Sequence, residues 1–159
     1  MELLSSEAVH EVAFFKRHAR DDAAQTAPGL EALLGFPVKV RARLLATLAA
    51  VAKAPPKRFA GGGQWEAMHD KMTGYFEARI TSQTANGKWH YRLFCLLDYA
   101  AAGKTSPLLT VIDGVTKPYR TTLPNTRYDK VRKLGDEYLQ RNPRSLATAD
   151  DVRAAVKED

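Results

Sequence analysis

The chain has 159 residues, 45% of them hydrophobic, and 24 lysines and arginines against 18 acidic residues, which fits one globular domain with a basic surface. It has no run of eighteen apolar residues, and acidic residues interrupt any apolar stretch near the N-terminus, so we expect no membrane span, no secretory signal and a cytoplasmic protein. The single cysteine, Cys95, excludes an internal disulfide and is expected to be a small core residue.

The N-terminal third predicts one strand followed by two helices. β-branched and aromatic residues between positions 9 and 16 are typical of a strand, and a polar loop follows. The segment 28–35 suits a short helix, and Pro37 opens a longer one with its apolar residues at helical spacing. Helices this close in sequence form a helical hairpin, which ends at residues 54–58.

Three strands are expected in the middle of the chain, at residues 72–80, 89–98 and 108–112. The dipeptide Asn86-Gly87 supplies a hairpin turn between the first two. Alternation gives each strand two different faces. In the second strand, one side holds Tyr91, Leu93, Cys95 and Leu97, and the other holds His90, Arg92, Phe94 and Leu96.

Two helices complete the predicted fold. One begins at Asn125 or Thr126 and ends before Pro143, and the other begins with a capping box at Thr148. The resulting order, β-α-α-β-β-β-α, predicts an α+β fold: an antiparallel sheet, a helical hairpin packed on one face and a C-terminal helix. We expect residues 1–147 to form a single domain and residues 148–159 a short, acidic, helical tail.

Positive charge gathers in the middle of the chain. Residues 37–58 hold six cations and no acid, and residues 115–134 hold six cations against Asp129 alone. This distribution favours an anionic partner, and solvated side chains on helix faces are the alternative. The four histidines show no ligand spacing, Gly103-Lys-Thr105 lacks the first glycine of a phosphate-binding loop, and we expect neither a metal nor a cofactor.

Arg92 interrupts an otherwise apolar strand, and burying an unpaired guanidinium is costly. It either forms a structural ion pair with Glu77 or Asp98, or faces a groove in which an anion completes it. Arginine suits the second role because its planar fork binds phosphate with two hydrogen bonds.

Three segments in succession carry a family resemblance: Gly74-Tyr-Phe-Glu-Ala-Arg79, His90-Tyr-Arg-Leu-Phe94 and Leu109-Thr-Val-Ile-Asp-Gly-Val-Thr-Lys117. Their order and spacing resemble the RelE/ParE toxin superfamily, and more narrowly its HigB and phage-derived branch. The helical hairpin before them and the helix after them fit the same order, so the resemblance covers roughly residues 9–141.

The resemblance implies the toxin of a type II toxin–antitoxin system, an endoribonuclease that cleaves mRNA on the ribosome and inhibits translation without a metal. Its implied partners are a cognate antitoxin protein and ribosome-bound mRNA, with no membrane. In this chemistry the RNA 2′-hydroxyl attacks the adjacent phosphate, which requires alignment, a proton acceptor and cations. Two alternatives stay open: a ParE-like inhibitor of DNA gyrase, and a non-catalytic, phage-derived interaction protein on the same fold.

The resemblance also nominates catalytic residues. Arg92 matches the strand arginine that contacts the scissile phosphate, and Arg79 matches the cation of the preceding strand. Lys117 and Arg120 match a basic cluster, although Pro118 and Tyr119 follow Lys117 where the family often has a second cation. The remaining candidates are Tyr119, for a tyrosine that some members use, and His90, a possible general base; the cations expected to bind RNA are Lys57, Arg58, Arg127 and Lys130.

Overall fold

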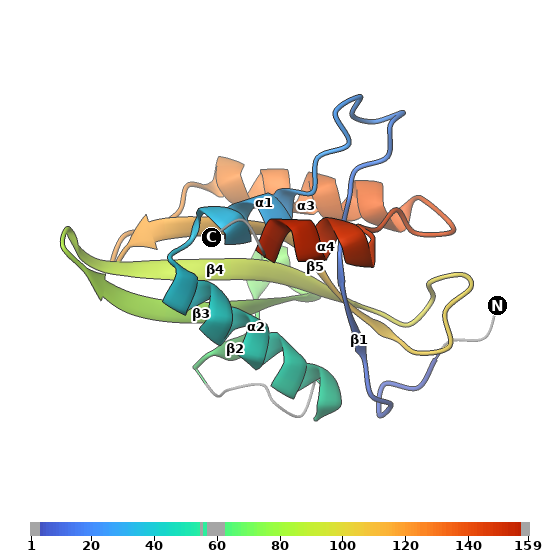
Figure 1. Cartoon of the computed structure of the whole chain (residues 1–159), viewed down its shortest axis with the longest axis horizontal. Coiled ribbons are helices and arrows are strands. Elements are labelled where there is room, and N and C mark those ends of the chain that lie inside the picture. The colour runs from blue at the N-terminus through green and yellow to red at the C-terminus, as the bar shows by residue number, and fades with distance from the viewer. Residues whose placement is uncertain (1–3, 55, 57–62, 157–159) are drawn as a thin grey trace.

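The computed structural model describes residues 4–54, 56 and 63–156 of the chain (Figure 1). Its strands are β1 (Glu11–Phe14), β2 (Trp65–Ala67), β3 (Tyr75–Thr84), β4 (Gly87–Asp98) and β5 (Leu108–Pro118). Its helices are α1 (Pro28–Gly35), α2 (Val38–Lys53), α3 (Asn125–Leu139) and α4 (Ala149–Val156), with a short 3₁₀ helix at Asp70–Met72. The fold is α+β, as predicted. The described part contains no helix long and apolar enough to cross a membrane.

The five strands form one mixed sheet in the order β1-β5-β4-β3-β2. Neighbouring strands from β2 to β5 are antiparallel, whereas β1 runs parallel to β5, with Glu11 opposite Leu108. The prediction of an antiparallel sheet is therefore wrong at β1. Alternation within a strand does not encode its direction relative to a distant strand, and here α1, α2 and three strands lie between the two in the sequence.

Helices cover both faces of the sheet (Figure 1). The hairpin of α1 and α2 packs on one face together with α4, around core residues such as Leu44, Ala78 and Leu93. α3 packs on the opposite face, where Val131 and Tyr138 lie in a second apolar cluster. In the described residues, α1, α2 and α4 thus share one face, and α3 covers part of the other.

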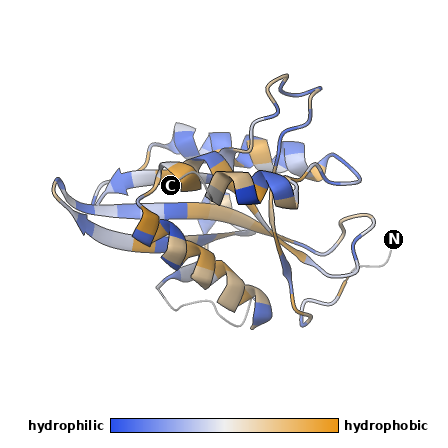
Figure 2. Cartoon of the chain, in the orientation of Figure 1, coloured by the Kyte–Doolittle hydropathy of each residue, from blue (hydrophilic) through white to orange (hydrophobic). Residues whose placement is uncertain are grey.

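Strand β4 changes character along its length. Figure 2 shows it hydrophilic near the β3–β4 hairpin and hydrophobic toward the middle of the sheet. Phe94 and Leu96 lie in the apolar cluster beneath α3, while Arg92 contacts only the first turn of that helix, through Tyr128. Because α3 begins at this point and does not cover the hairpin end of the sheet, that end of the face keeps partly exposed polar side chains.

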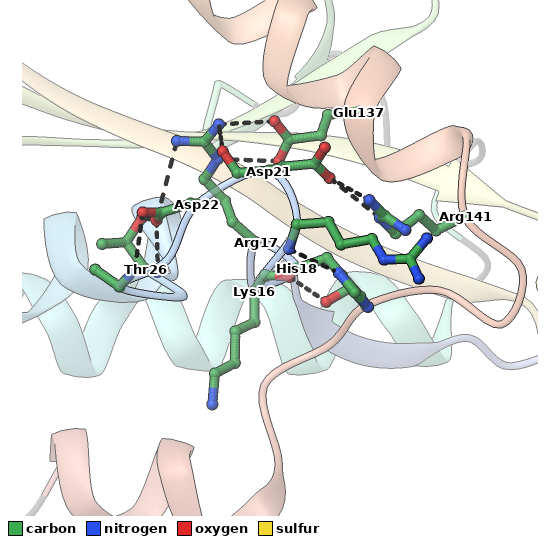
Figure 3. A network of polar contacts seen from close by, with 11 residues as sticks. Lys16, Arg17, His18, Asp21, Asp22, Thr26, Glu137 and Arg141 are labelled. Carbon is green, nitrogen blue, oxygen red and sulfur yellow. Dashed lines mark hydrogen bonds and ion pairs between the residues drawn. The ribbon is translucent and has the colours of Figure 1, made fainter.

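Polar networks hold the long loop before α1 and the chain after α3. Arg17 in the loop donates to both carboxylate oxygens of Glu137 on α3, at 2.9 and 2.8 Å, and Arg141 donates to Asp21 at 2.9 Å (Figure 3). Within the loop, the hydroxyl of Thr26 donates to Asp22 at 2.7 Å, and this hydrogen bond lowers the pKa of the Asp22 carboxyl. The loop is therefore fixed to α3.

A second polar network lies inside the protein, where β4 ends. Asp98 accepts hydrogen bonds from Tyr138 Oη at 2.6 Å and from Arg144 Nε at 2.8 Å. The tyrosine hydroxyl also contacts Thr110 Oγ1 at 2.9 Å. Buried polar groups are tolerated when such partners satisfy them.

The predicted capping box begins α4. Thr148 N donates to the Asp151 carboxylate at 2.8 Å, and Asp151 N donates to Thr148 Oγ1 at 3.0 Å. Val152 and Ala155 of this helix pack against the core formed with α1 and α2. α4 therefore lies on the sheet face opposite α3.

Candidate nucleic-acid interface

A row of polar side chains crosses three strands at the hairpin end of the α3 face. The register places Arg79 opposite Arg92, Thr81 opposite His90, and His90 opposite Lys117. Residues opposite one another in antiparallel strands point to the same side of the sheet. We call this set the polar strip; it consists of Glu77, Arg79, Thr81, His90, Arg92 and Lys117.

Arg92 forms a buried ion pair. Its Nε donates to Glu77 Oε2 at 2.6 Å, its Nη2 contacts the same oxygen, and its Nη1 donates to Tyr128 Oη at 3.1 Å. The arginine is only 7% exposed. Of the two alternatives that the sequence left open, the structure shows the ion pair, and Glu77 rather than Asp98 is the partner. Arg92 is therefore not an open fork for phosphate.

Glu77 explains why two arginines can stand opposite each other. Like charges in a cross-strand pair are destabilising. Glu77 precedes Arg79 by two residues on the same face of β3, and its carboxylate contacts Arg92 through Oε2 and Arg79 through Oε1, the latter at 3.6 Å. Arg79 is the more accessible arginine, because its side chain is 33% exposed and its ion-pair contacts are longer. Arg79 can turn an N–H toward a ligand.

His90 lies at the centre of the strip. Its Nδ1 is 2.6 Å from Thr81 Oγ1, which fixes the ring and makes Nε2 the nitrogen that would exchange a proton with a substrate. Burial lowers the pKa of His90 below its ordinary value, and the charges of Lys117, Arg79 and Arg92 lower it further. The imidazole is consequently neutral at pH 7 and can accept a proton.

Tyr119 lies beside His90, just after β5. The two rings meet edge to face, with centroids 5.0 Å apart. Lys88 Nζ and the Arg120 guanidinium lie 4.8 and 5.3 Å from the centre of the tyrosine ring. A hydrogen bond with Arg120, followed by the charges of Arg120 and Lys88, lowers the pKa of the Tyr119 hydroxyl. The structure therefore brings a proton acceptor and an acidified phenol together among cations.

The turn after β5 positions the remaining predicted cations. Lys117 Nζ donates to Thr121 O at 2.5 Å, and burial followed by the charge of Arg92 lowers the pKa of this lysine. Arg120 is exposed and has a φ of 63°, in the left-handed region that non-glycine residues rarely adopt. Both cations thus lie next to the pair of His90 and Tyr119.

The four residues predicted to bind RNA outside the strip have different positions. Arg127 donates to the buried Asp113 carboxylate at 2.7 Å and to Gly114 O at 3.0 Å, so it holds α3 against β5. Lys130 is exposed on α3. Lys57 and Arg58 lie outside the described residues.

Sequence reasoning missed two contributors and left the role of a third open. Lys88 is an isolated cation beside the hairpin turn, Thr81 orients His90, and Glu77 was considered only as a possible partner of Arg92. The register that follows from the hairpin turn is the signal that could have found them. In the described part of the chain, no group of three or more histidine, cysteine or acidic side chains could hold a metal ion.

Comparisons of the chain with models of protein families, with curated proteins and with solved structures found no match. The chemistry of the polar strip and of the residues around it is therefore the basis on which a function can be proposed.

Proposed function

We propose that this chain is the toxin of a type II toxin–antitoxin system and acts as a metal-independent endoribonuclease on ribosome-bound mRNA. The observation that carries the proposal is the contact between the rings of His90 and Tyr119 among cations, whose charges contribute to the lowered pKa of both side chains. Cations surround both groups. This arrangement offers a base, an acid and positive charge at the phosphate, which RNA cleavage by general acid–base catalysis uses.

In the proposed reaction, His90 Nε2 removes the proton of the RNA 2′-hydroxyl. The 2′-oxygen then bonds to the adjacent phosphorus, and the bond from phosphorus to the 5′-oxygen breaks. The Tyr119 hydroxyl gives its proton to this leaving oxygen, so the products are a 2′,3′-cyclic phosphate and a 5′-hydroxyl. Lys117, Arg79 and Arg120 stabilise the negative charge that develops on the phosphate oxygens. DNA lacks the 2′-hydroxyl and is not cleaved.

Arg92 has a positioning role in this proposal. Its ion pair with Glu77 fixes the two buried members of the strip. Its charge contributes to the lowered pKa of both His90 and Lys117. It acts on the reaction through these groups, because each of its three guanidinium nitrogens already contacts Glu77 or Tyr128.

The test combines expression and purified protein. We expect the wild-type chain to arrest growth and translation, and to cleave mRNA in ribosomal complexes in the presence of EDTA. His90→Gln should reduce cleavage by roughly 100-fold or more, the scale of a general base, without changing the melting temperature. Lys39→Ala, an exposed cation of α2 on the other sheet face, is the matched control. Unchanged cleavage by His90→Gln would overturn the mechanism.

The ion pair of Arg92 favours one other candidate, a non-catalytic binding protein, because a bonded arginine does not contact phosphate directly. Such a protein would bind RNA with the same surface and leave it intact. Growth arrest with intact mRNA and an induced DNA-damage response would indicate instead a ParE-like inhibitor of DNA gyrase.

A further inference from the structure

A cavity of about 390 Å³ lies between the 3₁₀ helix and the first turn of α3. Met68, Met72 and Tyr128 supply apolar wall, and Met72 is buried at 4% exposure. The polar groups of the same lining come from four exposed residues, His69, Asp70, Lys71 and Asn125. Its size lies within the range of small-molecule sites, and its lining combines an apolar wall with polar groups that can form hydrogen bonds.

Tyr128 joins this cavity to the polar strip. One part of the residue lines the cavity, and its hydroxyl accepts the hydrogen bond from Arg92 Nη1 at 3.1 Å. Phe94 meets the tyrosine ring edge to face, with centroids 6.1 Å apart, and holds it in place. A polymer whose charged backbone lies on the polar strip therefore also passes next to the cavity, because Tyr128 borders both.

We propose that the cavity receives a nucleobase, guanine in preference to other bases, of an RNA whose backbone lies on the polar strip. The inference rests on the proposed RNA-binding function and adds a specificity site to it. Base recognition in single-stranded RNA combines stacking on aromatic side chains with hydrogen bonds to base edges, and Tyr128 with Asp70 and Asn125 offers both.

The preference for guanine follows from the charge of Asp70. A carboxylate only accepts hydrogen bonds, and guanine presents two adjacent donors, N1–H and the 2-amino group, to one such fork. Uracil offers a single N–H between two carbonyl oxygens, which a carboxylate repels. The Asn125 amide can both donate and accept, so it can satisfy the remaining edge of the base.

The backbone at Asp70 provides a matched variant. Its φ is 55°, in the left-handed region. Aspartate and asparagine adopt this conformation more readily than other non-glycine residues. Asp70→Asn therefore keeps the shape of the turn, removes the charge and replaces one acceptor oxygen with an NH2 donor. Asp150→Asn, on the exposed first turn of α4, makes the same chemical change on the opposite sheet face and serves as the control.

The experiment titrates GMP, UMP and inorganic phosphate into the full chain and follows backbone amide signals by NMR. We expect GMP to bind roughly five- to a hundred-fold more tightly than UMP, the discrimination of a bidentate base contact. GMP should shift the signals of Asn125 and Tyr128, whereas phosphate should shift those of the strip. Asp70→Asn should abolish the preference, and Asp150→Asn should leave it intact.

Two results would overturn the inference: equal binding of GMP and UMP by the wild-type chain, or GMP shifts confined to the strip. Either can occur in a chain that still cleaves RNA, in which case the proposed function survives without this site. Conversely, a chain that discriminates GMP in the cavity and cleaves no RNA retains the base site and loses the nuclease mechanism. A thermal melt of each variant confirms that it is folded.

Discussion

Replacing Arg92 with alanine will lower the stability of the fold, whatever it does to function. The change leaves the Glu77 carboxylate, whose side chain is 8% exposed, without its closest partner. Breaking a buried ion pair from one side costs about 3–5 kcal/mol. Arg79 stays 3.6 Å from the other carboxylate oxygen and offsets part of the loss, so we expect the lower end, about 3 kcal/mol.

For a domain of this length, that loss corresponds to a melting temperature roughly 6–12 °C lower. Denaturant unfolding of wild type, Arg92→Ala, Glu77→Ala and the double variant measures the coupling energy of the pair directly. Arg43→Ala, an exposed cation of α2, is the control and should change the free energy of unfolding by less than about 0.5 kcal/mol. A coupling energy near zero would refute the structural role of the pair. Loss of toxicity in Arg92→Ala alone is therefore no proof of catalysis.

Three further predictions concern titration and packing. The pKa of His90, followed by NMR, should lie below 6.5, and Lys117→Met should raise it, because a neighbouring positive charge is removed; an unchanged value would contradict this. Burial raises the pKa of Asp98, but the hydrogen bonds that its carboxylate accepts outweigh burial and lower the pKa overall. The free energy of unfolding should therefore fall as the pH drops through about 4 and below. Asp98→Asn should flatten this pH dependence. Gly135→Ala places a Cβ 1.8 Å from Tyr75 Oη and should cost about 1–3 kcal/mol in denaturant unfolding, partly restored by Tyr75→Phe.

Local patterns predicted the elements of the fold well. The helix at Pro28–Gly35, the capping box at Thr148 and the two faces of β4 all depend on neighbours in sequence, and the structure confirms each. Strand β2 was not predicted, because three residues are too few to show alternation. The parallel pairing of β1 and the position of α3 opposite the other helices depend on contacts between distant segments, which no local pattern contains.

The candidate site was predicted in part. Alternation placed His90 and Arg92 on one face of β4, and the structure brings both beside Lys117. Whether Arg92 meets a carboxylate or a ligand was decided by register, because Glu77 lies diagonally across the β3–β4 pair. Arg127 was expected to bind RNA but pairs with Asp113, which precedes Gly114 in a mostly apolar strand. The partner of such a charged residue depends on contacts between distant segments and cannot be read from the local sequence.

The division of β3 and β4 into two independent faces has an evolutionary consequence. Near the hairpin, alternate residues such as Thr81 and His90 stay partly exposed, while Tyr91 and Leu93 belong to the core. Substituting these partly exposed residues changes the chemistry of the surface and leaves the core packing intact. Inserting or deleting one residue does the reverse, because it moves charged groups into the interior. Descendants of this chain can therefore acquire new targets by point substitution, whereas a change of length in these strands destroys the scaffold.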